Sequence, residues 1–214
     1  MSKPLLNLFF LSILLTILST TLAYHHHPIH KHPKPTPNFI WSSCLSTRYP
    51  PLCFHSLKSY GSKIGRSQRQ LTLAALAVSL SKARSAVGFV SQVTKVKGIK
   101  RHELEAVKDC IDTMSDSVDQ LSQSFEELAN LGHTNGEDFM WHMSNVQTWV
   151  SAALTDETTC VDGFSDGVHE NSGKIKSSIQ VRVNNVAQVT SNALALVNKY
   201  VDRFNGRAYH VKSP

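Results

Sequence analysis

Long segments of this chain repeat apolar residues at intervals of three and four, the spacing that places side chains on one face of an α-helix. Similar spacing occurs in four separate segments, and its clearest run is Leu104, Val107, Ile111, Met114, Val118, Leu121, Phe125 and Leu128. We therefore expect helices at about 67–96, 100–131, 137–154 and 173–204, with a broken or short helical piece over 155–167.

Helix-breaking residues fall between these segments rather than inside them. No proline occurs between Leu52 and Ser213, and glycine follows two of the predicted helices at Gly98 and Gly132. Ser67 is a candidate N-cap, as is Ser172. Because the connections are short, neighbouring helices should run antiparallel. The sequence predicts an all-α, up-down-up-down four-helix bundle.

The four cysteines fall into two pairs by position. Cys44 and Cys53 lie nine residues apart on either side of two prolines, whereas Cys110 and Cys160 lie fifty apart in proline-free sequence. Four cysteines allow three pairings. We favour Cys44–Cys53, which would close a small N-terminal helical hairpin built from 38–47 and 52–60, and Cys110–Cys160, which would join the second and third helices. Free or metal-bound thiols are the alternative, although the chain has no CxxC spacing.

The N-terminal residues resemble a secretory signal. A basic start at Lys3 precedes an apolar run, and small residues stand at the −3 and −1 positions of a cleavage site after Ala23. The run is shorter than the roughly 20 residues that span a bilayer. We expect residues 1–23 to be removed and the mature chain to be secreted, with no membrane segment. Secretion favours oxidised cysteines.

Residues 24–38 form a segment rich in histidine and proline. Proline at this density excludes a helix, so we expect a flexible arm ahead of a domain over 39–205 and a tail over 206–214. The simplest interpretation is a solvated linker. A second hypothesis is that the histidines gain charge as the pH falls toward 5 and that the arm then binds an anionic polysaccharide. Metal binding by this tract is a less favoured alternative.

Charge and motifs exclude several classes of function. The formal net charge is +6, but no basic stripe with interleaved aromatic residues is visible, and we expect no nucleic-acid partner. No GxSxG, phosphate-binding glycine loop or HExxH occurs. His142 is interpreted as an isolated histidine that is either at the surface or has its hydrogen bonds satisfied, and the aspartates of 109–119 as a solvated helix face. Trp141 and Trp149 are each interface or core residues, with core favoured for Trp149. We assign no catalytic, cofactor-binding or metal-binding residue and do not expect an enzyme.

Three segments resemble one known family. Residues 106–121 (AVKDCIDTMSDSVDQL), 144–164 (SNVQTWVSAALTDETTCVDGF) and 191–197 (SNALALV) are similar to the second, third and fourth helices of plant invertase/pectin methylesterase inhibitors. The family has the same arrangement of cysteines. The resemblance covers roughly 39–205, and because the chain ends at Pro214 we expect a free-standing inhibitor.

The resemblance implies a secreted protein of the apoplast and cell wall that inhibits pectin methylesterase. It implies a 1:1 complex in which one face of the bundle covers the pectin-binding cleft and the catalytic carboxylates. Inhibitors of acid invertase typically carry Pro-Lys-Phe before the third helix, where this chain has Glu137-Asp138-Phe139. Invertase inhibition is therefore the second alternative, and a non-inhibitory, polyanion-binding wall protein is the third.

Helical geometry and the resemblance together predict which residues meet the enzyme. They are the polar positions opposite the apolar stripes of the second and third helices: Asp109, Thr113, Asp116, Gln120, Asn145, Thr148 and Ser151. A carboxylate that faces another carboxylate binds better when one of them is protonated. We therefore expect Asp116 to contribute to a pH-dependent complex.

Overall fold

The computed structural model describes residues 37–132, 136–164 and 173–212, with side chains from Phe39 to Asn205 within those ranges. The predicted signal sequence, almost all of the histidine-rich arm and the candidate N-cap Ser172 lie outside the described residues. The described ranges include all four predicted long helices and all four cysteines.

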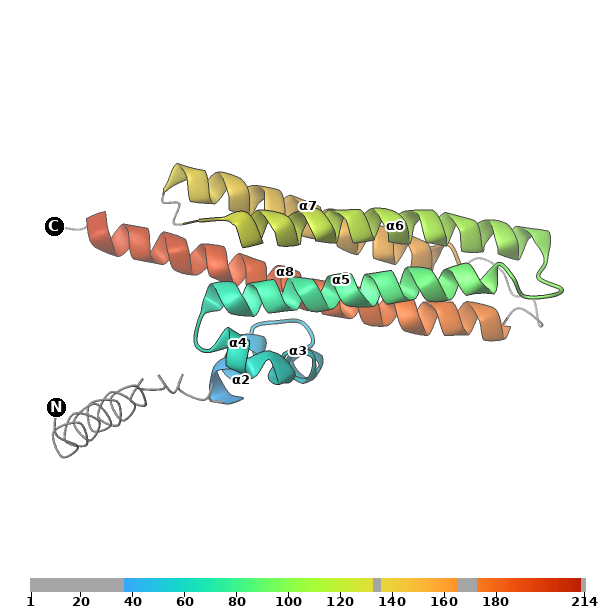
Figure 1. The fold of residues 1–214 in the computed structure, drawn as a ribbon, viewed down its shortest axis with the longest axis horizontal. Helices are drawn as coiled ribbons and strands as arrows, with labels where there is room; N and C mark the ends of the chain where they lie inside the picture. The colour runs from blue at the N-terminus through green and yellow to red at the C-terminus, as the bar shows by residue number, and fades with distance from the viewer. Residues whose placement is uncertain (1–36, 133–135, 165–172, 213–214) are drawn as a thin grey trace, which may run out of the picture. The chain divides into compact units, whose positions relative to one another are not determined.

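Four long helices form the body of the domain (Figure 1). They are α5 (Gln68–Val93), α6 (Arg101–Asn130), α7 (Glu137–Asp162) and α8 (Gly173–Lys212). Each helix packs on the two beside it, so that α5 contacts α6 and α8, and α7 contacts the same two helices. No strand occurs in the described residues. The all-α four-helix bundle predicted from periodicity is confirmed.

Two helix ends differ from the prediction. We expected the third helix to end at 154 and a broken piece to follow, but α7 continues without a break to Asp162. Threonine hydroxyls in this stretch donate to carbonyls of the preceding turn, as Thr159 does to Thr155 at 2.9 Å, and therefore do not disrupt the helix. Cys160 thus lies inside α7. Similarly, α8 continues beyond the predicted end at 204 to Lys212.

A group of short helices precedes the bundle. It consists of α2 (Pro37–Cys44), α3 (Pro50–Leu57), the 3₁₀ turn η1 (Lys58–Tyr60) and α4 (Gly61–Ile64). The Cys44–Cys53 disulfide joins α2 to α3, which confirms the predicted hairpin. The sequence pattern did not predict α4. The connection to α5 is made by Gly65, whose φ of +55° favours glycine, and by Ser67, whose hydroxyl accepts the Gln70 N–H as the predicted N-cap.

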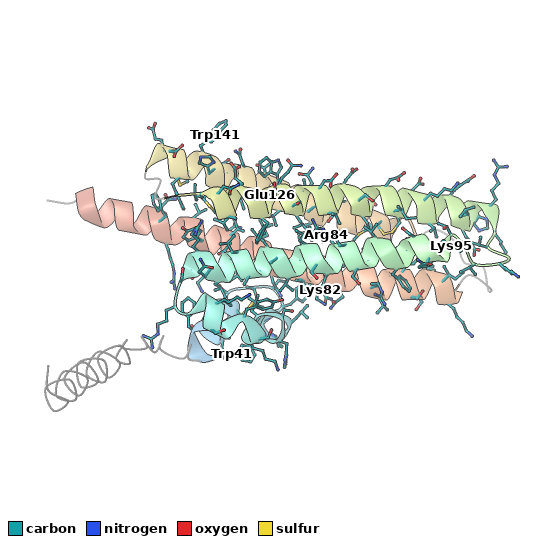
Figure 2. All side chains as sticks on the ribbon, viewed as in Figure 1. Trp41, Lys82, Arg84, Lys95, Glu126 and Trp141 are labelled. Carbon is teal, nitrogen blue, oxygen red and sulfur yellow. A yellow bond between two sulfur atoms is a disulfide. The ribbon has the colours of Figure 1, made fainter. Side chains whose placement is uncertain are left out.

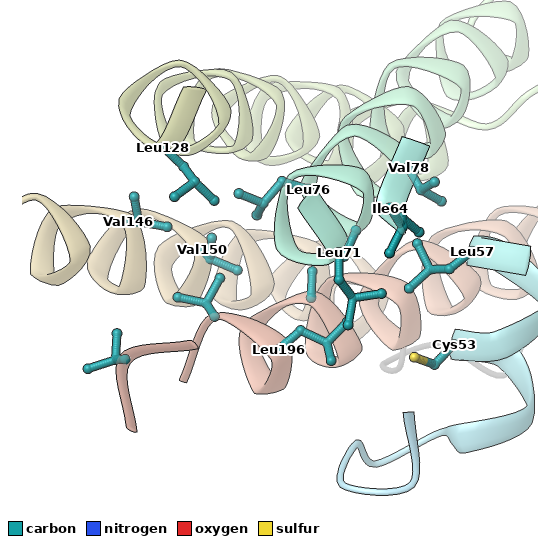
Figure 3. Close-up of a cluster of buried hydrophobic side chains, with 14 of the residues drawn as sticks. Cys53, Leu57, Ile64, Leu71, Leu76, Val78, Leu128, Val146, Val150 and Leu196 are labelled. Atoms are coloured by element: carbon teal, nitrogen blue, oxygen red, sulfur yellow. The ribbon is translucent and has the colours of Figure 1, made fainter. Parts of the chain in front are cut away.

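Polar side chains of α8 attach this hairpin to the bundle, and Lys199 donates to the Ser43 carbonyl at 3.3 Å and to the Ser46 hydroxyl at 3.1 Å. Asn192 in α8 accepts a hydrogen bond from the Tyr49 N–H at 2.9 Å and donates one to the Tyr49 carbonyl at 3.0 Å. Leu57 and Ile64 also pack into the same apolar cluster as Leu71 of α5 (Figure 3). The short helices therefore belong to the core of the domain.

The helix α5 is the most apolar of the four. By length and composition alone it could cross a membrane, although we expected no membrane segment in the mature chain. In the bundle its apolar residues form part of the core, among them the fully buried Leu71, Leu76 and Val90. Burial against α6 and α8 accounts for this composition without a membrane.

A single arginine links the start of α5 to the end of α6. One terminal nitrogen of Arg69 lies 2.9 to 3.0 Å from the carbonyl oxygens of Leu128, Ala129 and Leu131. The last carbonyls of a helix have no partner within it, and a cation there also opposes the negative end of the helix dipole. Arg69 therefore terminates α6 from a neighbouring helix.

Candidate functional site

The predicted interface lies on α6 and α7, whose antiparallel alignment is fixed by three contacts. Near one end, the Cys110–Cys160 disulfide joins the helices with a Cα–Cα distance of 4.4 Å. In the middle, the Ser117 hydroxyl donates to Glu157 at 2.9 Å. Toward the other end, the His142 ring lies 2.7 Å from Glu127. Both predicted disulfides are thus present, and none of the four cysteines is free.

The predicted interface residues form an elongated strip rather than a compact patch. Asp109, Asp116, Thr148 and Ser151 are exposed. Thr113, Gln120 and Asn145 are half-buried. Because the helices are antiparallel, the α6 members lie beside the second half of α7, whereas the α7 members lie beside the second half of α6. The strip covers roughly 25 Å at 1.5 Å per helical residue.

At the disulfide end, the strip contains a shallow hollow of about 360 Å³. Its wall is formed by His102, Glu105, Ala106, Asp109, Cys110, Thr113, Thr159, Cys160 and Gly163. The hollow therefore brings two predicted interface residues of α6 together with Thr159 of α7, which the apolar periodicity did not select. Thr159 belongs to this surface because α7 extends through this region instead of ending at 154.

At the other end, a histidine contacts two carboxylates. His142 Nδ1 lies 2.7 Å from Glu127 and its Nε2 lies 3.5 Å from Asp138, while the Asn145 amide donates to Glu127 at 3.1 Å. The hydrogen bond to Glu127 raises the pKa of His142, and the same bond lowers the pKa of Glu127. We had expected His142 to be isolated, and this is wrong; of the two alternatives, it is the histidine whose hydrogen bond is satisfied. The spacing of four residues from Asp138 was the signal available in the sequence.

In the middle of the strip, two carboxylates from different helices lie near each other. Burial raises the pKa of Asp156, and the negative charge of Asp116 raises it further. Asp116 was predicted to be part of the interface, whereas Asp156 was missed because we had ended the helix before it. A half-buried carboxylate beside a second one gains a proton more readily than usual.

The residue that follows Asp156 is a fully buried glutamate. Glu157 is inaccessible to solvent, and one of its oxygens accepts hydrogen bonds from Ser117 and Thr190, both at 2.9 Å. The other oxygen is buried with no hydrogen-bond partner among the described residues. Burial raises the pKa of Glu157 to about 8, so the group is neutral in acidic and neutral solution. It joins α6, α7 and α8 and does not reach the surface.

Charge is unevenly divided among the four helices. Thirteen of the sixteen Asp and Glu residues of the chain lie in α6 and α7, which contain only two cationic side chains, Arg101 and Lys108. In contrast, α5 and α8 carry ten Lys and Arg residues and a single acid, Asp202. The protein is basic overall, yet the face that carries the predicted interface is strongly acidic.

The two tryptophans of α7 differ in exposure. Trp141 is 68% exposed near the start of the helix and points away from the bundle (Figure 2). Trp149 is half-buried, so neither of the two alternatives describes it fully. Within the described residues no group of histidine, cysteine and carboxylate side chains could hold a metal ion. The face therefore offers charge, hydrogen-bonding groups and one exposed ring.

A match to a family model decides which protein family this chain belongs to. Residues 38–196 match the model described as plant invertase/pectin methylesterase inhibitor. The chain belongs to this family. The match includes the hairpin, both disulfides and most of the bundle, and the proteins of the family are enzyme inhibitors rather than enzymes.

Comparisons with individual proteins support the same family assignment. The chain is 50% identical to pectinesterase inhibitor 9 of Arabidopsis thaliana over 208 residues, covering 92% of this chain and 95% of that protein. It is 47% identical to the 21 kDa protein of Daucus carota, covering 78% and 85% of the two chains. A crystal structure of a mutant pectin methylesterase inhibitor from Arabidopsis superposes with a TM-score of 0.57 at 19% identity, covering 72% of this chain and 92% of that one. This last match supports the fold.

Proposed function

We propose that this protein is a secreted inhibitor of pectin methylesterase that acts in the apoplast and cell wall. The observation that carries the proposal is the acidic, disulfide-locked face of α6 and α7 in a chain 50% identical to a pectinesterase inhibitor over almost its whole length. Further relatives at 40% and 37% identity are also named pectinesterase inhibitors, which favours the esterase over acid invertase.

The proposed mechanism is occlusion in a 1:1 complex. One face of the bundle lies across the pectin-binding cleft and covers the catalytic carboxylates of the enzyme. The contacts are made by the predicted strip, extended by Asp156 and Thr159, with Trp141 at its end. Since the Cys110–Cys160 bond and Glu157 hold α6 and α7 in one alignment, little conformational freedom remains to be lost on binding.

The acidic character of the strip gives the complex a pH dependence. Asp116 and Asp156 would face carboxylates of the enzyme, and their mutual repulsion already favours a proton on Asp156. Binding should therefore tighten as the pH falls.

Titration of the mature protein against a plant pectin methylesterase and an acid invertase, each at pH 5 and pH 7, tests this proposal. We expect saturable, stoichiometric inhibition of the esterase, with stronger inhibition at pH 5. Inhibition of the invertase alone would show that the protein is an acid invertase inhibitor. Inhibition of neither enzyme would favour a non-inhibitory, polyanion-binding wall protein.

A matched pair of variants tests the assigned face. Asp116→Ala removes an exposed carboxylate from α6, and Asp202→Ala removes one from α8. We expect the first to flatten the pH profile of inhibition and the second to leave it unchanged. The same change in both variants would show that net charge, rather than the α6–α7 face, determines the profile.

The histidine-rich arm adds a separate proposal. If its charged histidines bind pectin, deletion of residues 24–37 should weaken retention on an anionic polysaccharide at pH 5. Unchanged retention would leave the arm as a linker.

A further inference from the structure

The opposite side of the bundle contains a second polar groove, formed where α5 and α8 lie side by side. The groove has a volume of about 640 Å³ and is open to solvent. Its wall is formed by Lys82, Ser85, Phe89, Lys174, Ser177, Ser178, Val181, Arg182, Asn185 and Val186. Three of these side chains are cationic and none is acidic. Figure 2 shows Lys82 on α5, away from Glu126 on α6.

Two contacts across the groove hold its cations in place. The Arg182 guanidinium lies 4.2 Å from the centre of the Phe89 ring, in the arrangement of a cation–π pair. The Lys82 ammonium donates to the Asn185 side-chain oxygen at 2.8 Å. Each contact joins α5 to α8. The Lys82 contact uses one of its N–H donors, and the Arg182 contact uses one face of its guanidinium. Lys has three donors and Arg has five, so both keep donors for a ligand.

The groove is elongated and mixed in character. Its α8 wall runs from Lys174 to Val186, which is about 18 Å along the helix axis at 1.5 Å per residue. Serine hydroxyls lie between the cations, and Val181, which is 70% exposed, supplies an apolar surface beside them. A charged sugar chain requires three features of its binding site. Cations of the protein pair with its carboxylates, hydroxyls of the protein hydrogen-bond to its hydroxyls, and an apolar patch packs against the C–H groups of its rings.

We propose that the α5–α8 groove binds a linear polyuronate, a sugar chain with a carboxylate on each ring. The choice of a polyuronate over other polyanions rests on the proposed function. Pectin methylesterase hydrolyses the methyl esters of pectin and so leaves a carboxylate on each sugar ring that it de-esterifies. A concave groove fits a strand better than a planar membrane. The one aromatic ring of the groove wall, Phe89, is half-buried and lies against the Arg182 guanidinium, which makes it a poor platform for stacking a nucleobase.

The two faces then have separate ligands. The acidic α6–α7 face would bind the enzyme, and the basic α5–α8 groove would bind polymer that the enzyme has already de-esterified. An inhibitor bound in this way would accumulate in de-esterified regions of the wall.

Binding of the complete mature protein to polygalacturonate, measured by calorimetry at pH 7 and low salt, tests the proposal. The comparison ligands are highly methyl-esterified pectin, heparin and phosphatidylserine vesicles. We expect binding to polygalacturonate that weakens with salt and with methyl esterification. Equal binding to the esterified pectin, or binding only to heparin or to vesicles, would overturn the proposal.

Two variants with the same change in net charge locate the site. Lys174→Gln with Arg182→Gln removes two cations of the groove, and Arg101→Gln with Lys108→Gln removes two exposed cations of α6. We expect the first pair to weaken binding about tenfold, as the loss of charged hydrogen bonds implies, and the second to have little effect. Equal weakening by both pairs would show non-specific attraction and overturn the site.

A third variant avoids the structural contacts of the groove. Val181→Glu places a negative charge at an exposed position and should abolish binding without lowering thermal stability. Unchanged binding by this variant would also overturn the proposal. Inhibition of pectin methylesterase should be retained by the two groove variants, Lys174→Gln with Arg182→Gln and Val181→Glu. If the wild-type protein bound polygalacturonate and did not inhibit the esterase, the proposed function would fail and the binding groove would remain.

Discussion

The hydroxyl of Ser117 in α6 donates a hydrogen bond of 2.9 Å to Glu157 in α7, in a layer of the bundle that water does not reach. Thr190 of α8 donates to the same oxygen. A single carboxyl group therefore connects three of the four helices. It does so in its neutral form, because burial raises its pKa to about 8.

The buried carboxyl should make stability depend on pH. In the unfolded chain Glu157 has its ordinary pKa of 4.5, and in the folded protein a pKa of about 8. Its contribution is complete below pH 4.5 and is lost as the pH rises toward 8, at up to roughly 1 kcal/mol per pH unit. Urea unfolding of the wild type and Glu157→Gln across this range should show a steeper decline with pH in the wild type, because the variant lacks the contribution of Glu157. Parallel profiles for the two proteins would contradict it.

The two disulfides should have different effects on inhibition. Replacing Cys110 and Cys160 by serine should lower the free energy of unfolding by about 4 kcal/mol, because a loop of 50 residues is released. It should also weaken inhibition, since the bond aligns α6 and α7.

The Cys44–Cys53 pair is the control. Its removal should cost about 2.7 kcal/mol. Inhibition should remain when measured well below the melting temperature. If both double variants inhibit as well as the wild type, the long disulfide does not position the interface.

The contact between Glu127 and His142 should be visible in a titration of the histidine by NMR. Because the hydrogen bond to Glu127 raises the pKa of His142 above 6.5, Glu127→Gln should return the midpoint toward that value. Asp138→Asn should have a smaller effect, since Asp138 lies farther from the ring, at 3.5 Å. The stabilisation by this contact is complete between about pH 4.5 and pH 6.5; it is lost as the pH rises through the raised pKa of His142 and as the pH falls through the lowered pKa of Glu127. An unchanged midpoint in Glu127→Gln would refute the pairing.

Arg69 should contribute to stability through the end of a helix that it does not belong to. Arg69→Ala leaves the last carbonyls of α6 without this donor and should lower the free energy of unfolding by about 2 kcal/mol. Arg69→Lys keeps the charge but has a single nitrogen on a flexible stem, and should recover part of the loss. Urea unfolding of both variants measures this, and equal stability of Arg69→Ala and the wild type would show that water replaces the arginine without cost.

Much of the fold followed from the order of residues along the chain. Apolar spacing of three and four, proline-free segments and glycines at their ends predicted the four helices, because these patterns reflect the local geometry of a helix. Cysteine spacing predicted both disulfides. The prediction was wrong over 155–162, where we expected a broken or short helical piece and α7 continues unbroken. The helix persists there because threonine hydroxyls bond to the preceding turn and Glu157 is held by Ser117 and Thr190.

Only the tertiary structure decided which distant residues share a surface. His142 looked isolated because its partner Glu127 lies on another helix. No basic stripe was visible in the sequence, because Lys82 and Arg182 are far apart along the chain and meet only where α5 packs on α8. The sequence by itself determined helices, disulfides and family, which depend on local periodicity and spacing. The acidic face and the basic groove depend on how the helices are aligned, which is set by contacts between segments that the linear pattern does not contain.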